Sequence, residues 1–238
     1  MPDFSQRSSD LEIMDDLNCS GEVVDQTLRE LEFINTWLGG NQVTIDALQK
    51  LIGKNGTAKP IHIADLGCGG GDMLRLIYHW ALRNGIPVVL TGIDANPGII
   101  AFAKTNLKEL PQIQLQAIDI FSEEFRAMKF DVVIGTLFYH HFSDDQLSVF
   151  FRQLSQQVTT GFIINDIHRH PLAFYSIRLL TRLFSKSSMV KYDAPLSVLR
   201  AFTKKELTTT LNKASVQKFS IQWKWAFRWQ VIARSANQ

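Results

Sequence analysis

The stretch DLGCGGGD at residues 65–72 determines which fold this chain is expected to adopt. An apolar run at residues 61–64 precedes it, and an amphipathic run at residues 73–83 follows it. A strand, a glycine turn and a helix in this order place a nucleotide-like ligand against the N-terminus of the helix. Glycine permits positive φ angles and lets a ligand approach the backbone. The stretch therefore predicts a loop that binds a nucleotide-like ligand.

The acids of this loop distinguish it from a dinucleotide-binding loop. A G-x-G-x-x-G/A fingerprint that begins at Gly67 needs Gly or Ala at position 72, where this chain has Asp72. Asp65 stands just before the glycines, and no Lys or Arg lies between the two acids. Because carboxylates repel a pyrophosphate, the loop favours a cationic ligand. S-adenosylmethionine, which carries an ammonium and a sulfonium group, fits this requirement.

At these residues the chain resembles the class I S-adenosylmethionine-dependent methyltransferases, whose first motif reads approximately D-x-G-x-G-x-G. The motif stands here as Asp65, Gly67, Gly69 and Gly71. The layout is similar to that of the methyltransferases of ubiquinone and menaquinone biosynthesis, over about residues 60–233. The resemblance implies S-adenosylmethionine as cofactor and a small molecule as methyl acceptor. A glycine turn that only packs a strand against a helix is the structural alternative.

Composition fits one large globular domain with attachments. The 238 residues are 45% hydrophobic and 20% charged, and the net charge of +2 is too small to indicate a nucleic-acid partner. No run of 18 apolar residues predicts a membrane span, and the polar N-terminus has no signal-like apolar segment. Cys19 and Cys68 form neither a disulfide framework nor a metal-binding pattern. We expect a cytoplasmic protein with reduced thiols, and the sequence is silent on its oligomeric state.

Strands and helices are predicted to alternate through most of the chain, which is typical of a doubly wound, Rossmann-like α/β sheet. Asn96-Pro97 and the capping box SDDQ at 143–146 predict two of the helix starts. Two further strands, at 216–223 and 227–233, lie too close together for a helical crossover and should pair antiparallel. The expected sheet has seven strands, mostly parallel, with a C-terminal hairpin. The five parallel strands are predicted at 61–66, 88–93, 113–118, 131–135 and 161–165.

Two segments are expected outside this sheet. Residues 1–59, loose and polar to about residue 20 and then helical at 21–38 and 43–52, should form an N-terminal lid. A linker at 53–60 would join it to a cofactor-binding domain at 60–238. An insert at about 168–200 mixes apolar and basic residues, and its helix could roof a substrate pocket, dock on a partner or rest on a membrane. Packing against the N-terminal helices is the structural alternative.

Four aromatic residues near the C-terminus alternate along the chain: Trp223, Trp225, Phe227 and Trp229. A period of two places side chains on one face of a strand. We therefore expect these rings to form one buried sheet face rather than a surface that stacks on substrate.

The candidate cofactor residues follow the strands, because ligands of such sheets bind beyond the C-terminal strand ends. Asp94 can accept both ribose hydroxyls, and Ala95 and Asn96 would flank the adenosine. The resemblance implies that Asp119 receives the adenine amine and that Ile120 covers the ring; Asp119 could instead be a helix cap. With Gly135 and Thr136, which the resemblance places beside the methionine moiety, the predicted set is Asp65, Gly67, Cys68, Gly69, Asp72, Asp94, Ala95, Asn96, Asp119, Ile120, Gly135 and Thr136.

Histidines at the same edge are the candidate catalysts. The sulfonium methyl is already activated, so the protein must align it with a nucleophile and remove the proton of a hydroxyl group. His140 and His141 follow the fourth strand, and His168 follows the fifth, where Asp166 could orient it. Their spacing matches no recognised metal motif, so no metal is expected.

Three residues of the same loops are candidate contacts to the substrate. Tyr139 precedes the histidine pair, Asp166 ends the fifth strand, and Arg169 could hold an anionic group of the acceptor. A pairing of Arg169 with an acid is the structural alternative.

These observations predict a methyltransferase that acts on a small, fairly apolar hydroxylated aromatic, polyketide or quinone precursor. Oxygen is the preferred acceptor, with in-line displacement and a histidine base, and carbon is the second choice. A non-catalytic regulatory protein that binds S-adenosylmethionine remains an alternative. Asp72 disfavours a nicotinamide-dependent oxidoreductase. The lack of a basic stripe disfavours a nucleic-acid methyltransferase, and no nucleic-acid partner is expected.

Overall fold

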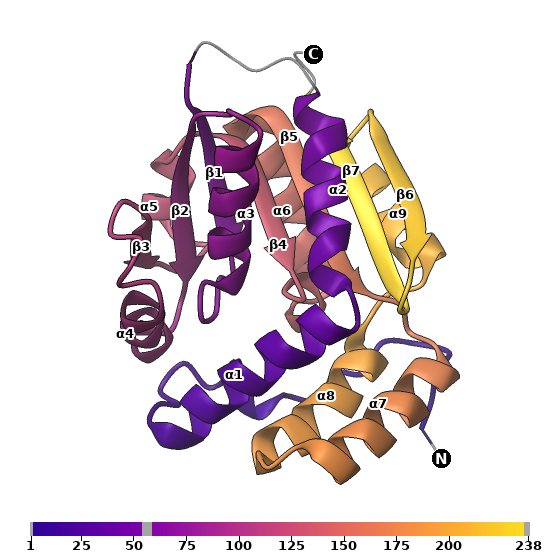
Figure 1. Ribbon diagram of the computed structural model, residues 1–238. Helices are drawn as coiled ribbons and strands as arrows, with labels where there is room; N and C mark the ends of the chain where they lie inside the picture. Colours follow the sequence, from indigo (N-terminus) through magenta and orange to yellow (C-terminus); the bar gives the residue numbers. More distant parts are fainter. Residues whose placement is uncertain (1, 54–58, 236–238) are drawn as a thin grey trace.

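Five parallel strands and an antiparallel C-terminal pair form one sheet in the computed structural model, which describes residues 2–53 and 59–235. Most of the predicted linker and the last three residues therefore lie outside the described residues. The strand order is β3-β2-β1-β4-β5-β7-β6, with β7 antiparallel to both neighbours (Figure 1). This confirms the predicted Rossmann-like sheet. The strands are β1 (Ile61–Leu66), β2 (Val88–Asp94), β3 (Gln114–Ala117), β4 (Phe130–Thr136), β5 (Val158–Ile167), β6 (Phe219–Lys224) and β7 (Arg228–Arg234).

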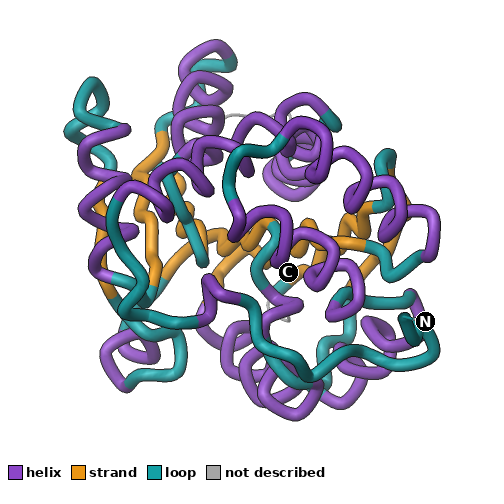
Figure 2. The backbone as a smooth tube through the Cα atoms, turned by 90° about the horizontal axis from the view of Figure 1, so that it is seen from below, coloured by secondary structure: helices purple, strands orange, loops and turns teal. Residues whose placement is uncertain are grey.

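Helices cover both faces of the sheet, and Figure 2 shows the strands between the two helical layers. Each face has its own hydrophobic core, one around Ile63 and Ile77, the other around Phe151, which stacks on Phe162 with 5.5 Å between the ring centroids. The predicted helix starts are confirmed, since Asn96 and Ser143 both cap their helices. One layer holds α2 (Gly40–Ile52), α3 (Asp72–Arg83) and α4 (Pro97–Asn106), and the other holds α5 (Glu123–Ala127), α6 (Asp144–Gln157) and α9 (Lys204–Lys213).

Three more helices cross the end of the sheet where the parallel strands terminate: α1 (Glu22–Trp37), α7 (Pro171–Phe184) and α8 (Ser188–Arg200) (Figure 1). The insert thus forms two helices, not one, because the chain turns at residues 185–187 and Ser187 caps α8. Glu30 of α1 accepts hydrogen bonds from the backbone of this turn, as the structural alternative for the insert expects.

The N-terminal residues expected to be loose are instead tied down. Residues 4–19, here called the N-terminal strap, run along α8 and include a short 3-10 helix, η1 (Ile13–Asp15). The backbone nitrogen of Ser8 donates to the Leu199 oxygen at 3.0 Å, and that of Ile13 donates to Asp193 at 2.8 Å. Whether the predicted N-terminal region acts as a lid stays a prediction.

The expectation for the C-terminal aromatics is wrong. Trp229 is buried, but Trp223 and Trp225 are 46% and 69% exposed. The reason is that the chain turns between β6 and β7 at residues 225–227, and β6 lies at the sheet edge, so one alternation does not run through all four rings. Within the described residues, no helix is long and apolar enough to cross a membrane.

Candidate functional site

A cavity of about 840 Å³ lies at the C-terminal ends of the parallel strands, beneath α1, α7, α8 and the N-terminal strap. Its size is in the range of small-molecule sites. Of the predicted cofactor residues, Gly135 does not line the cavity. The Tyr139 ring packs against Gly135, and a Cβ at this position would lie 2.5 Å from Tyr139 Cε2. The other predicted cofactor residues all line the cavity: Asp65, Gly67, Cys68, Gly69, Asp72, Asp94, Ala95, Asn96, Asp119, Ile120 and Thr136.

The glycine loop needs its first glycine for two reasons. Gly67 has φ +62°, which side chains rarely adopt, and a Cβ there would lie 2.2 Å from the ring of Phe138. The backbone therefore lies directly against that ring. The loop ends at Gly71, the N-cap of α3, so α3 begins at Asp72, one residue before the predicted amphipathic run.

The carboxyl groups of this loop region crowd one another: Asp65 is buried, and Asp72 and Asp94 are half-buried. Burial, together with the charges of Asp72 and Asp94, raises the pKa of Asp65 well above its ordinary value. Burial and the nearby Glu32 raise the pKa of Asp72 to about 6. Burial also raises the pKa of Asp94. A cationic ligand relieves this repulsion, so the electrostatics favour the positively charged ligand predicted from the sequence.

Asp94 also ties the loop to the end of β2. Its Oδ2 accepts a hydrogen bond from the Gly69 nitrogen at 3.3 Å, and its Oδ1 accepts one from the Asn96 nitrogen at 3.0 Å. The Asn96 side chain caps α4 and donates to the Cys19 carbonyl at 2.8 Å. Asn96 therefore joins the cofactor side of the cavity to the strap.

His140 is held by Asp166, which the sequence analysis paired with His168. Asp166 Oδ1 lies 2.7 Å from His140 Nδ1, and its Oδ2 accepts the backbone N–H groups of Tyr139 and His140. Burial raises the pKa of Asp166, but His140 and the backbone donors outweigh burial and lower it overall. With Nδ1 engaged, Nε2 is the free nitrogen of a buried histidine that lines the cavity.

Four predicted roles need correction. Asp166 is fully buried and positions His140, so it does not contact substrate. Tyr139 is fully buried in the core, and His168 packs on Trp229 outside the cavity wall. Arg169 is buried and binds Glu206 at 2.6 Å, as its structural alternative expected. The cause is that β5 continues two residues past the predicted end, which carries residues 168–169 beyond the cavity.

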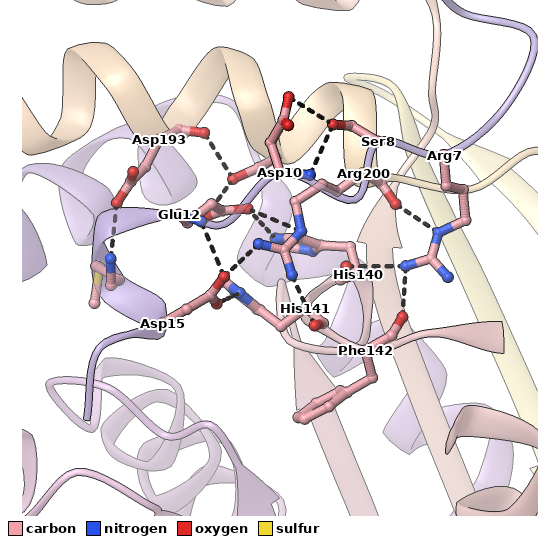
Figure 3. Close-up of polar contacts among 12 residues, drawn as sticks. Arg7, Ser8, Asp10, Glu12, Asp15, His140, His141, Phe142, Asp193 and Arg200 are labelled. Atoms are coloured by element: carbon pink, nitrogen blue, oxygen red, sulfur yellow. Dashed lines mark hydrogen bonds and ion pairs between the residues drawn. The ribbon is translucent and has the colours of Figure 1, made fainter. Parts of the chain in front are cut away.

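The N-terminal strap supplies acids that the sequence analysis missed (Figure 3). Glu12 Oε1 lies 3.6 Å from His140 Nε2, and Asp15 Oδ1 lies 2.6 Å from His141 Nδ1. Among the described residues, Glu12 Oε1 has no hydrogen-bond partner although Glu12 is only 6% exposed. Its neighbour Leu11 is 72% exposed, so the chain buries the acid and exposes the apolar residue. Such an inversion indicates function, and no periodicity in the sequence signals it.

The comparisons with known proteins agree with this geometry. Residues 63–161 match a family model described as "Methyltransferase domain". The chain therefore contains a methyltransferase domain. Its cofactor is S-adenosylmethionine, the cationic ligand that the acids of the glycine loop predict. A comparison with curated proteins gives no match.

Solved methyltransferase structures share the fold. Human N-acetylserotonin methyltransferase in complex with S-adenosylmethionine is similar with a TM-score of 0.62 and 19% identity, over 89% of this chain and 55% of that one. A plantazolicin methyltransferase in complex with S-adenosylhomocysteine gives 0.62 and 17%, over 90% and 95%. A CurJ carbon methyltransferase gives 0.61 and 14%, over 82% and 54%. The chain thus spans about half the length of two of these structures.

One group of side chains in the described part of the methyltransferase could hold a metal ion. Glu12, His140 and His141 offer ligand atoms within 4.8 Å of one another. However, Arg200 Nε lies 3.8 Å from Glu12 Oε1, and Arg200 also pairs with Asp15. A guanidinium group at this position repels a cation, so we assign the group to acid–base chemistry.

Arg7 should control how tightly the strap of the methyltransferase is closed. Its guanidinium donates to Asp144 at 2.6 Å and to the carbonyls of Arg200, His140 and Phe142 at 2.7 to 2.9 Å. We expect Arg7→Ala to lower the hydrogen-exchange protection of the Ser8 amide by roughly tenfold or more, since charged hydrogen bonds are lost. Arg126→Ala, which removes an exposed ion pair with Glu123, should leave it unchanged.

The strap should also loosen as the pH rises. Burial raises the pKa of Glu12 from 4.5 to about 7, despite the nearby His141, Arg200 and Ser197. When folding raises the pKa of an acid, the folded state becomes less stable as the pH rises from the pKa of the unfolded chain through the pKa of the folded one. We expect the free energy of strap opening, measured by hydrogen-exchange protection, to fall by about 1–2 kcal/mol between pH 5 and 8. Opening exposes Glu12 to water and so removes the cost of burying its ionised form. Glu12→Gln should abolish this slope, and Glu22→Gln, at an exposed position, should retain it.

Proposed function

We propose that this methyltransferase transfers the methyl group of S-adenosylmethionine to a hydroxyl oxygen of a small, fairly apolar acceptor. The acceptor class is a hydroxylated aromatic, polyketide or quinone precursor. His140 is the general base that removes the hydroxyl proton.

The distribution of polar and apolar groups supports this proposal. The acids that suit a cationic cofactor lie at the ends of β1 and β2, whereas most of the side chains that line the cavity from α7 and α8 are apolar. Between the two regions lie His140, His141 and Glu12. An apolar pocket with a few convergent polar groups is typical of a site for a small organic molecule. Apolar lining residues include Met14, Phe142, Ile177, Leu180 and Val198.

The contact between Asp166 and His140 carries the mechanism. Because Asp166 accepts a hydrogen bond at Nδ1, the neutral imidazole presents its Nε2 lone pair toward the cavity. The acceptor oxygen attacks the methyl carbon opposite the sulfur, and the carbon–sulfur bond breaks with its electron pair going to sulfur. The hydroxyl proton passes to Nε2. S-adenosylhomocysteine and the methyl ether are the products, and alignment supplies much of the rate.

Carbon is the alternative acceptor, because the same histidine could deprotonate an acidic carbon. A carbon methyltransferase is among the structures with a similar fold. The observation that favours oxygen is that Glu12 Oε1 lies 3.6 Å from His140 Nε2, because a hydroxyl group can bind to both side chains there.

The position of the transferred methyl group tests the proposal. The protein is incubated with methyl-labelled S-adenosylmethionine and a panel of apolar phenols, each paired with its methyl ether as control. We expect label bonded to oxygen in the phenols, seen by NMR of the product, and none in the ethers. Label bonded to carbon would establish the alternative, and no turnover with any acceptor would favour a non-catalytic regulatory protein.

A further inference from the structure

The outer face of α7 is apolar and uncovered. Five large side chains on this helix are each between 50% and 78% exposed, although the rest of the helix packs inward through Ala173, Phe174 and Thr181. Their spacing places four of them in one stripe along the helix. An apolar surface of this kind marks a contact with another molecule or with a membrane. This α7 outer face consists of Leu172, Tyr175, Leu179, Leu183 and Phe184.

The charged side chains of α7 itself have one sign. Arg178 and Arg182 are exposed on α7, and Lys186 follows the helix. No Asp or Glu occurs in α7. Among the described residues, neither arginine forms a salt bridge. An apolar stripe flanked by unpaired basic side chains is the pattern of a helix that lies in the interface of an anionic membrane.

The same helix forms a wall of the cavity. Ser176, Ile177 and Leu180 line the cavity from α7, and Ser176 is also exposed, so the cavity reaches the surface beside this helix. The turn between β6 and β7 lies next to the start of α7, where Phe227 stacks on His170 with 5.3 Å between the ring centroids. This turn carries the exposed Trp225, which also lines the cavity. Tryptophan and tyrosine suit the boundary between lipid and water.

We propose that the α7 outer face rests on an anionic lipid bilayer. In Figure 1, α7 lies at the lower margin of the molecule. An acidic protein would also match Arg178 and Arg182, but it would need a shape complementary to five protruding apolar side chains. A bilayer accepts them without such a fit. Resting on the bilayer also places the cavity opening at the lipid surface, from which an apolar acceptor enters; this second step rests on the proposed function.

Vesicle flotation tests the proposal on the full chain, without cofactor or acceptor, so that its outcome is independent of methyl transfer. We expect at least tenfold stronger binding to vesicles with phosphatidylglycerol than to phosphatidylcholine alone, weakened by added salt. Leu179→Gln combined with Leu183→Gln should lose at least tenfold in binding. Arg178→Ala combined with Arg182→Ala should lose the preference for anionic lipid. Leu82→Gln, at a similarly exposed leucine on α3, should bind like the unaltered protein.

Three results would overturn the proposal. The first is an unaltered protein that does not float with anionic vesicles. The second is equal binding by the unaltered protein and the α7 variants. The third is a dimer in solution that Leu179→Gln and Leu183→Gln dissociate, which would assign this face to a second copy of the chain. Vesicle binding without any methyl transfer would instead count against the proposed function alone.

Discussion

Replacing His140 with alanine is expected to lower kcat by about 100- to 10,000-fold, the usual contribution of a general base. The affinity for S-adenosylhomocysteine should stay unchanged, because the proposed partner of His140 is the acceptor and not the cofactor. Asp166→Asn should also lower kcat, since an amide at this position no longer fixes the tautomer of His140. Initial rates across a pH series, together with calorimetry of cofactor binding, measure both effects.

His168 provides a matched control for this experiment. It is a histidine at the same edge of the sheet, but it packs on Trp229 and does not line the cavity. We expect His168→Ala to retain the rate at a protein stability close to that of the unaltered chain. If His140→Ala turns over at full rate at every pH, histidine base catalysis is excluded.

Replacing Asp94 with alanine is expected to weaken the binding of S-adenosylmethionine by roughly 1.5–3 kcal/mol, or about 10- to 150-fold. The predicted role of this side chain is to bind the cofactor ribose, and it also accepts hydrogen bonds from the backbone at Gly69 and Asn96. Asp94→Asn keeps the size of the side chain but loses its charge, so its affinity for the cofactor should lie between those of the unaltered protein and Asp94→Ala. Calorimetry with S-adenosylhomocysteine gives the dissociation constants directly.

Asp145 offers a control for the removal of a carboxylate, because it is an exposed acid in the first turn of α6 that does not line the cavity. Asp145→Ala should leave cofactor affinity unchanged. An Asp94→Ala protein with unaltered affinity would remove Asp94 from the cofactor site and would question the ribose contact as a whole.

The fold could be predicted from the sequence because its signals are local. The glycine stretch, the caps at Asn96 and Ser143, and the short gap between β6 and β7 each involve residues close together in the chain. The predicted cofactor acids also meet, because the C-terminal ends of neighbouring parallel strands lie at one edge of the sheet. The strand order therefore brings residues that are distant in the sequence together in one site.

The acceptor side depends on lengths and on distant packing, which no local pattern reports. Two additional residues in β5 decide that Asp166 orients His140 and that His168 lies elsewhere. Glu12 belongs to a segment without helical or strand periodicity, and its role arises from packing against α8 and the loop after β4. For the same reason the sequence does not predict that Trp223 and Trp225 are exposed, because their alternation ends at the turn between β6 and β7.

The N-terminal strap has a kinetic consequence. Arg7 fastens one end to the loop that carries His140, while Cys19 is fastened to Asn96 on the cofactor side. A single piece of chain therefore bridges the donor and acceptor compartments. If the strap opens as the predicted lid would, both compartments are uncovered in the same event, and departure of the spent cofactor would be coupled to departure of the methylated product. Opening of the strap would then be a conformational step that contributes to the turnover rate.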